Sequence, residues 1–152
     1  MTTFIHPFTF GDRTQSDLLG GKGANLAEMV KIGLPVPPGF TITTEACREF
    51  LLSEKIPEAL PVQLEKALAN LEKELGKEFG NPAKPLLVSV RSGAKFSMPG
   101  MMETVLNVGM TPEVAQAMGE QSGNPKFAWD CYRRFVDMYG RIVCDVPNEE
   151  FH

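Results

Sequence analysis

The sequence has 152 residues, a hydrophobic content of 43% and a formal net charge of -4 at neutral pH. This size and apolar content predict one ordinary globular domain that covers residues 1–152. The acidic balance excludes a bulk attraction to nucleic acid or to anionic lipid, so any anion site must come from a few locally placed cations.

The cysteines and the short apolar runs indicate a cytoplasmic protein. Cys47, Cys131 and Cys144 are odd in number and lack paired spacing, and the N-terminus has no secretory pattern. Cys47 and Cys131 fall on apolar helical stripes, which predicts buried, unreactive thiols. The apolar runs are too short to cross a bilayer, and the sequence shows no cluster with metal-ligand spacing. We therefore expect no membrane span and no metal site in this chain.

The first half of the chain predicts short strands that alternate with helices. Proline interrupts the first strand, Gly33-Leu34-Pro35 ends the first helix, and four leucines point one face of the last helix at a core. In chain order the elements are a strand over Phe4 to Phe10, a helix from Asn25, a strand over Phe40 to Thr44, and helices over Glu45 to Ser53 and Val62 to Leu75.

The second half begins with "LLVSVR", residues 86–91, which is apolar at nearly every position and predicts a strand covered on both faces with Arg91 at its C-terminal end. A β-rich segment over 104–110 follows. Thr111 and Asn124 each precede a proline, which is typical of a helix start. Together the elements predict an α+β fold with a small mixed or antiparallel sheet flanked by about five helices.

The stretch "LLGGKGAN", residues 18–25, is the first candidate binding segment. Its glycines allow close approach of the backbone to a ligand, and Lys22 places a cation beside the free N–H groups of the helix expected to follow. These features are typical of a phosphate site, although the Walker A spacing is missing. The alternative is a flexible turn with a solvated lysine.

Arg91 and the segment "SGAKFSMPGMME" after it form the second candidate. An arginine at a strand end binds phosphate through its planar fork, and Lys95, Ser97 and backbone N–H groups up to Gly100 are suited to wrapping phosphates as a lid. Met98, Met101 and Met102 are adaptable apolar groups. The alternatives are a surface arginine paired with a carboxylate and methionines that fill a core.

Long stretches, "LLGGKGANLAEMVKIGLPVPPGFTITTEACREFL" and "VSVRSGAKFSMPGMMETVLNVG", together with the later "FAWDCYRRFVDMYG", closely resemble the N-terminal nucleotide-binding region of pyruvate phosphate dikinase. Phosphoenolpyruvate synthase is similar through "GGK" and "PVPPGF" but has a different, more acidic loop after "VRS". The resemblance implies the first part of an ATP-grasp nucleotide-binding domain in a longer enzyme, with ATP and Mg²⁺ as its cofactors.

By position, the resemblance assigns Lys22 and Arg91 as phosphate-binding cations and residues 97–103 as a glycine-rich cover over the transferring phosphates. The residues of this cover are Ser97, Met98, Pro99, Gly100, Met101, Met102 and Glu103. Many family members have aspartate at the position of Glu103, which leaves the role of this glutamate open. No catalytic residue is expected in this chain, because the metal ligands and the phosphoryl-carrying histidine of the family lie further along.

The resemblance implies that ATP and the remaining domains of a dikinase are the partners of this chain. In isolation the chain is expected to be catalytically silent and to form a homo-oligomer, because a face that normally meets another domain would be bare. The alternative is a stand-alone, non-catalytic nucleotide-binding or adaptor module.

Overall fold

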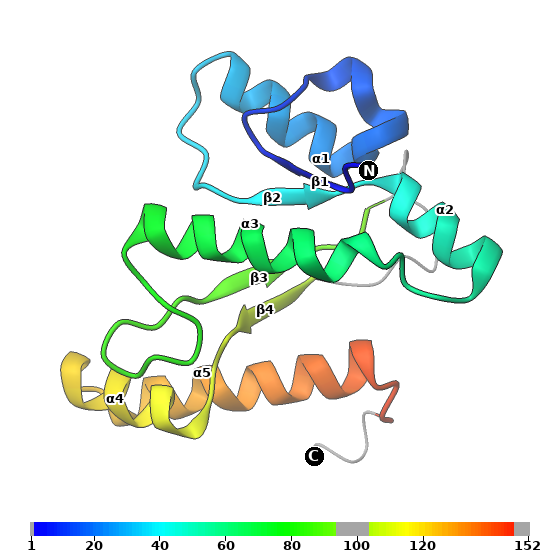
Figure 1. The fold of residues 1–152 in the computed structure, drawn as a ribbon. Coiled ribbons are helices and arrows are strands. Elements are labelled where there is room, and N and C mark those ends of the chain that lie inside the picture. Colours follow the sequence, from blue (N-terminus) through cyan, green and yellow to red (C-terminus); the bar gives the residue numbers. More distant parts are fainter. Residues whose placement is uncertain (1, 94–103, 148–152) are drawn as a thin grey trace. The chain divides into compact units, whose positions relative to one another are not determined.

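The computed structural model describes residues 2–93 and 104–147 (Figure 1). These residues divide into two compact units: the first runs to Glu74, and the second contains Leu75–Ser92 and residues 104–147. Five α-helices and two antiparallel two-stranded sheets lie in the described residues, which confirms the predicted α+β class. The prediction that residues 1–152 form a single domain stays a prediction.

The first unit is built on a short antiparallel sheet. Strand β1 (Ile5–Pro7) pairs with β2 (Phe40–Ile42), and Ile5 lies opposite Ile42. β1 is shorter than the predicted strand over Phe4 to Phe10, although the N–H of Phe8 still donates to the carbonyl of Gly39 at 3.1 Å. The helices of the first unit are α1 (Ser16–Lys31), α2 (Thr44–Ser53) and α3 (Ala59–Leu75). A 3₁₀ turn, η1 (Arg13–Gln15), precedes α1.

The core of the first unit includes one face of α1, where Leu19, Ala24 and Ala27 are buried together. The N-terminal segment is tied to α3 by the side chain of Gln63. Its Oε1 accepts from the backbone N–H of Phe4 at 2.7 Å, and its Nε2 donates to the carbonyl of Thr2 at 2.7 Å. The Gln63 amide thus satisfies the N–H of Phe4 and the carbonyl of Thr2, while the carbonyl of Phe4 accepts from the N–H of Thr43.

Asp12 caps η1 and joins it to the far end of α1. Its carboxylate accepts from the hydroxyl and the backbone N–H of Thr14, and it accepts from Nζ of Lys31 at 3.1 Å. These hydrogen bonds, first those from Thr14 and then that from Lys31, lower the pKa of Asp12 to about 2. The start and the end of α1 are therefore linked through one carboxylate.

The second unit contains β3 (Val88–Val90), β4 (Val105–Val108), α4 (Pro112–Ser122), α5 (Pro125–Met138) and a π-helical turn, η2 (Tyr139–Val143). Both predicted caps are confirmed: Thr111 Oγ1 accepts from the N–H of Val114, and Asn124 Oδ1 accepts from the N–H of Phe127. Its core joins α4 to α5 through Met110, Val114, Ala115, Leu87, Met118, Cys131, Tyr132 and Phe135.

Three predictions of burial were wrong. Of the four leucines expected to face a core from α3, Leu71 is buried, Leu64 and Leu68 are half-buried, and Leu75 is 39% exposed. Strand β3 is not covered on both faces: Ser89 is exposed and Val90 is 53% exposed, while the buried residue of this segment is Leu86, just before the strand. Cys47 is exposed on α2, although Cys131 does pack beside the core of the second unit. Among the described residues, no helix is both long and apolar enough to cross a membrane.

Candidate functional site

Helix α1 is interrupted at Gly20. Its φ of 73° and ψ of 167° are far from helical values, while the residues on both sides of it are helical. Only glycine adopts such a backbone without strain. The prediction that the helix begins at Asn25 was wrong, because burial of Leu19 and Ala24 holds the glycine-rich stretch in helical form despite the low helix propensity of glycine.

The break gives α1 a second start, with Lys22 in the first turn after it. The first N–H groups of a helix have no partner within the helix and carry the positive end of its dipole. Lys22 is half-buried and belongs to the first turn after the break. A helix start with a cation in its first turn favours the binding of a phosphate group in general. The phosphate site expected for this stretch stays a prediction.

Gly23, one turn further on, has a packing role. A Cβ at this position would lie 2.9 Å from Cγ2 and 3.1 Å from Oγ1 of Thr41 on β2, so only glycine allows α1 to approach the strand this closely. The space beside the Cα of Gly23 is therefore filled by Thr41, and the expected approach of the Gly23 backbone to a ligand stays a prediction.

Arg91 follows β3 directly and is exposed, which confirms its predicted place at the strand end. The pairing of Val90 with Val105 places the two ends of the 91–104 connection at the same end of the β3–β4 pair. Lys22 belongs to the first unit and Arg91 to the second. The convergence of these two cations on one polyphosphate therefore stays a prediction.

The predicted cover over the phosphates lies outside the described residues. The roles assigned to its members stay predictions, and these members are Ser97, Met98, Pro99, Gly100, Met101, Met102 and Glu103.

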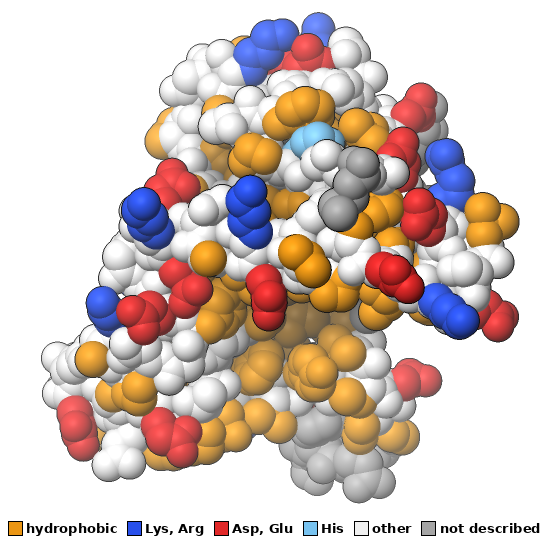
Figure 2. Space-filling model, in the orientation of Figure 1, with side chains coloured by type: hydrophobic (Ala, Val, Ile, Leu, Met, Phe, Trp, Pro, Cys, Tyr) orange, Lys and Arg blue, Asp and Glu red, His pale blue; other side chains and the backbone are white. Residues whose placement is uncertain are grey.

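Charge and metal-ligating groups give a further constraint. On the face shown in Figure 2, basic and acidic side chains are mixed, in keeping with the small net charge of the chain. Within residues 2–93 and 104–147, no three His, Cys, Asp or Glu side chains are grouped to hold a metal ion.

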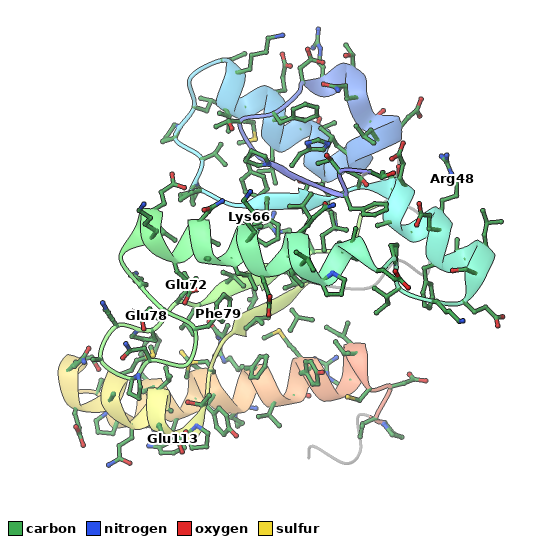
Figure 3. The ribbon with its side chains drawn as sticks, in the orientation of Figure 1. Arg48, Lys66, Glu72, Glu78, Phe79 and Glu113 are labelled. Atoms are coloured by element: carbon green, nitrogen blue, oxygen red, sulfur yellow. The ribbon has the colours of Figure 1, made fainter. Side chains whose placement is uncertain are left out.

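A groove of about 720 Å³ in the first unit is a rival place for a ligand. It lies between the Val36–Phe40 connector and α3, and Lys66, labelled in Figure 3, is the cation that lines it. Lys22 is not among its lining residues. The groove and the break in α1 are thus separate features that substitutions can distinguish.

Comparison with known proteins decides the family. The family model described as "Pyruvate phosphate dikinase, AMP/ATP-binding domain" matches residues 16–61 and 52–124. The chain belongs to this pyruvate phosphate dikinase family. The break at Gly20, Lys22 and Arg91 all lie inside the matched residues.

Individual pyruvate phosphate dikinases are similar to almost the whole chain. The chain is 48% identical over 152 residues to pyruvate, phosphate dikinase of Clostridium symbiosum and 51% identical over 156 residues to that of Rhizobium meliloti, in each case across 99% of this chain. It is 52% identical over 141 residues to pyruvate, phosphate dikinase 2 of rice. The chain spans about 17% of the length of the first and about 16% of the rice enzyme.

Sequence reasoning missed two residues that shape the site of this dikinase segment, Thr41 and Thr44. Thr41 packs against Gly23, and the Thr44 hydroxyl donates to the carbonyl of Asp17 at 2.5 Å. The available signal was the run "FTITTEA", in which threonines end a strand and begin a helix. Nothing in that run, however, indicates which part of α1 these threonines contact.

Proposed function

We propose that this chain is the ATP-binding part of a pyruvate phosphate dikinase, in which Lys22 and Arg91 bind the polyphosphate of ATP. The observation that carries the proposal is the break in α1, which places Lys22 in the first turn of a restarted helix inside a segment that matches an AMP/ATP-binding domain. A cation and the positive end of a helix dipole then act on the same phosphate group.

The two cations have different roles in this proposal. Lys22 is a compact point charge fixed by a buried segment, and Arg91 offers a planar fork that binds two phosphate oxygens at once. Residues 97–103 would cover the phosphates in the manner of an ATP-grasp enzyme. Magnesium, bound together with the nucleotide, would neutralise part of its charge and would take its protein ligands from outside the described residues.

The reaction of the whole enzyme would interconvert ATP, phosphate and pyruvate with AMP, pyrophosphate and phosphoenolpyruvate. Phosphoryl transfer requires cations and metal around the developing charge, and this chain supplies only part of that set. We therefore expect the isolated chain to be silent in a pyruvate-dependent assay. Its place in the cell would be the cytoplasm, with the remaining domains of the dikinase as partners.

Self-association of the isolated chain is part of the same proposal. Large apolar side chains are bare at the end of α2, where Leu51 is 72% exposed and Leu52 is 81% exposed. Exposed apolar patches favour contacts with a second copy or with a missing domain.

The test is a titration of the ¹⁵N-labelled chain with MgATP, followed through the amide signals of residues 20–23. NMR detects the weak binding expected of a partial site, with a Kd of about 1 mM or above. Lys22→Ala should abolish the saturable shifts. Arg91→Ala should weaken binding, whereas Lys66→Ala, which removes the cation of the rival groove, should leave it unchanged.

Three results would contradict the assignment. The first is the absence of any saturable shift with the wild-type chain. The second is binding that Lys22→Ala and Arg91→Ala leave intact. The third is a loss with Lys66→Ala as large as that with Lys22→Ala, which would place the ligand in the groove.

A further inference from the structure

The junction between β2 and α2 contacts α1 on both sides of its break. On the N-terminal side of Gly20, the carbonyl of Asp17 accepts a hydrogen bond from the Thr44 hydroxyl at 2.5 Å. On the C-terminal side, Gly23 lies against Thr41. Each contact is three residues from Gly20, so one short junction holds both segments of the helix.

The Thr44 hydroxyl donates to the carbonyl of Asp17, whose ordinary helical partner lies beyond the break at Gly20. In an unbroken α-helix the carbonyl of Asp17 would accept from the N–H of Gly21, four residues later. Gly20 leaves the helical conformation between these two groups. The Thr44 hydroxyl supplies a donor to that carbonyl from another element, and it thereby stabilises the end of the first segment.

We propose that Thr44 is a positioning residue for the nucleotide site: its hydroxyl holds the break in α1 and so fixes where Lys22 and the first N–H groups of the second segment point. This inference rests on the proposed function, because Lys22 matters only if it binds phosphate. Thr44 acts through Asp17 and the backbone of α1 and does not itself contact the ligand.

The neighbouring residue, Thr43, is a matched control. It lies in the same junction, but its side chain is 2% exposed and its hydroxyl has no hydrogen-bond partner among the described residues. Replacement by valine removes the hydroxyl and keeps the shape at either position. If the tie to Asp17 is what positions Lys22, only Thr44→Val should disturb the break, and Thr44→Ser should restore it.

The experiment measures the break without a ligand and then with one. Amide hydrogen exchange at Ala24 and Asn25, whose N–H groups are expected to make the first helical hydrogen bonds after the break, should be faster in Thr44→Val by about two- to tenfold, the range that one hydrogen bond supports. The exchange is followed by NMR in the full chain. Affinity for inorganic triphosphate with Mg²⁺ should fall by a similar factor. Thr44→Ser and Thr43→Val should match wild type in both measurements.

The outcomes separate the two claims. Unchanged exchange in Thr44→Val, or an equal effect of Thr43→Val, would overturn the positioning role. Faster exchange in Thr44→Val with wild-type affinity for triphosphate would overturn it as well. If Lys22→Ala leaves triphosphate binding intact, the proposed function fails whatever Thr44→Val shows, while the exchange data still decide whether Thr44 holds the break.

Discussion

Gly23→Ala tests whether the close approach of α1 to β2 is required. Alanine is favoured over glycine inside a helix by about 1 kcal/mol, which would stabilise the chain. The new Cβ would lie 2.9 Å from Cγ2 of Thr41 and 3.1 Å from its Oγ1. Overpacking of this kind costs about 1–3 kcal/mol. Rotation of Thr41 about χ1 gives little relief, because both branches of its side chain are already in contact.

We therefore expect Gly23→Ala to lower the free energy of unfolding by about 1 kcal/mol in the wild-type background. In a Thr41→Ala background both Thr41 atoms are gone and Cβ of Leu19 stays 3.3 Å from the new Cβ, so the same change should raise the free energy of unfolding by less than about 1 kcal/mol. Urea unfolding of the four proteins, monitored by circular dichroism, gives the coupling energy. An effect of Gly23→Ala that has the same sign and size in both backgrounds would refute the packing argument.

Three further substitutions test the fold around the site. Gly109→Ala should destabilise the second unit by about 2–4 kcal/mol. Gly109 has a φ of +113°, and the Cβ of an alanine there would collide with the carbonyl of Leu86. Wild-type stability of the variant in urea would contradict this. Asp12→Asn should reduce the decrease in the free energy of unfolding between about pH 4 and pH 2. In the wild type, hydrogen bonds from Thr14 lower the folded pKa of Asp12 to about 2, and the stabilisation by its carboxylate is lost as the pH falls. Parallel pH profiles of the two proteins would argue against this. Thr43→Val should leave the free energy of unfolding unchanged or raise it by up to about 1 kcal/mol, because it removes a buried hydroxyl that has no partner among the described residues. A clear decrease in thermal unfolding experiments would show that this hydroxyl is hydrogen-bonded in solution.

The parts of the fold that depend on local chemistry could be predicted from the sequence. Thr111 and Asn124 cap their helices as expected, because a capping side chain bonds to an N–H three residues away and needs nothing from the rest of the chain. The C-terminal ends of α2 at Ser53 and α3 at Leu75 were also predicted, from apolar periodicity and the turn residues that follow.

The parts that depend on distant contacts could not be predicted. The torsion of Gly20 lies outside the helical region while its neighbours stay helical, and that choice is fixed by residues more than 20 positions away, such as Thr44. The exposure of Val90 was missed for a similar reason, because a run of apolar residues predicts burial whether or not another element covers it. Lys22 and Arg91 could be proposed as candidates because cations beside glycines and at strand ends are visible in the sequence itself, and their role stays a prediction.

The most direct test of the account uses paramagnetic MnATP in place of MgATP. If Lys22 and Arg91 bind one polyphosphate, MnATP should broaden the amide signals around Lys22 and around Arg91 over the same concentration range, and excess MgATP should reverse both effects. Manganese alone should not reproduce the pattern. Broadening confined to only one of the two segments would contradict the claim that both cations bind the same nucleotide.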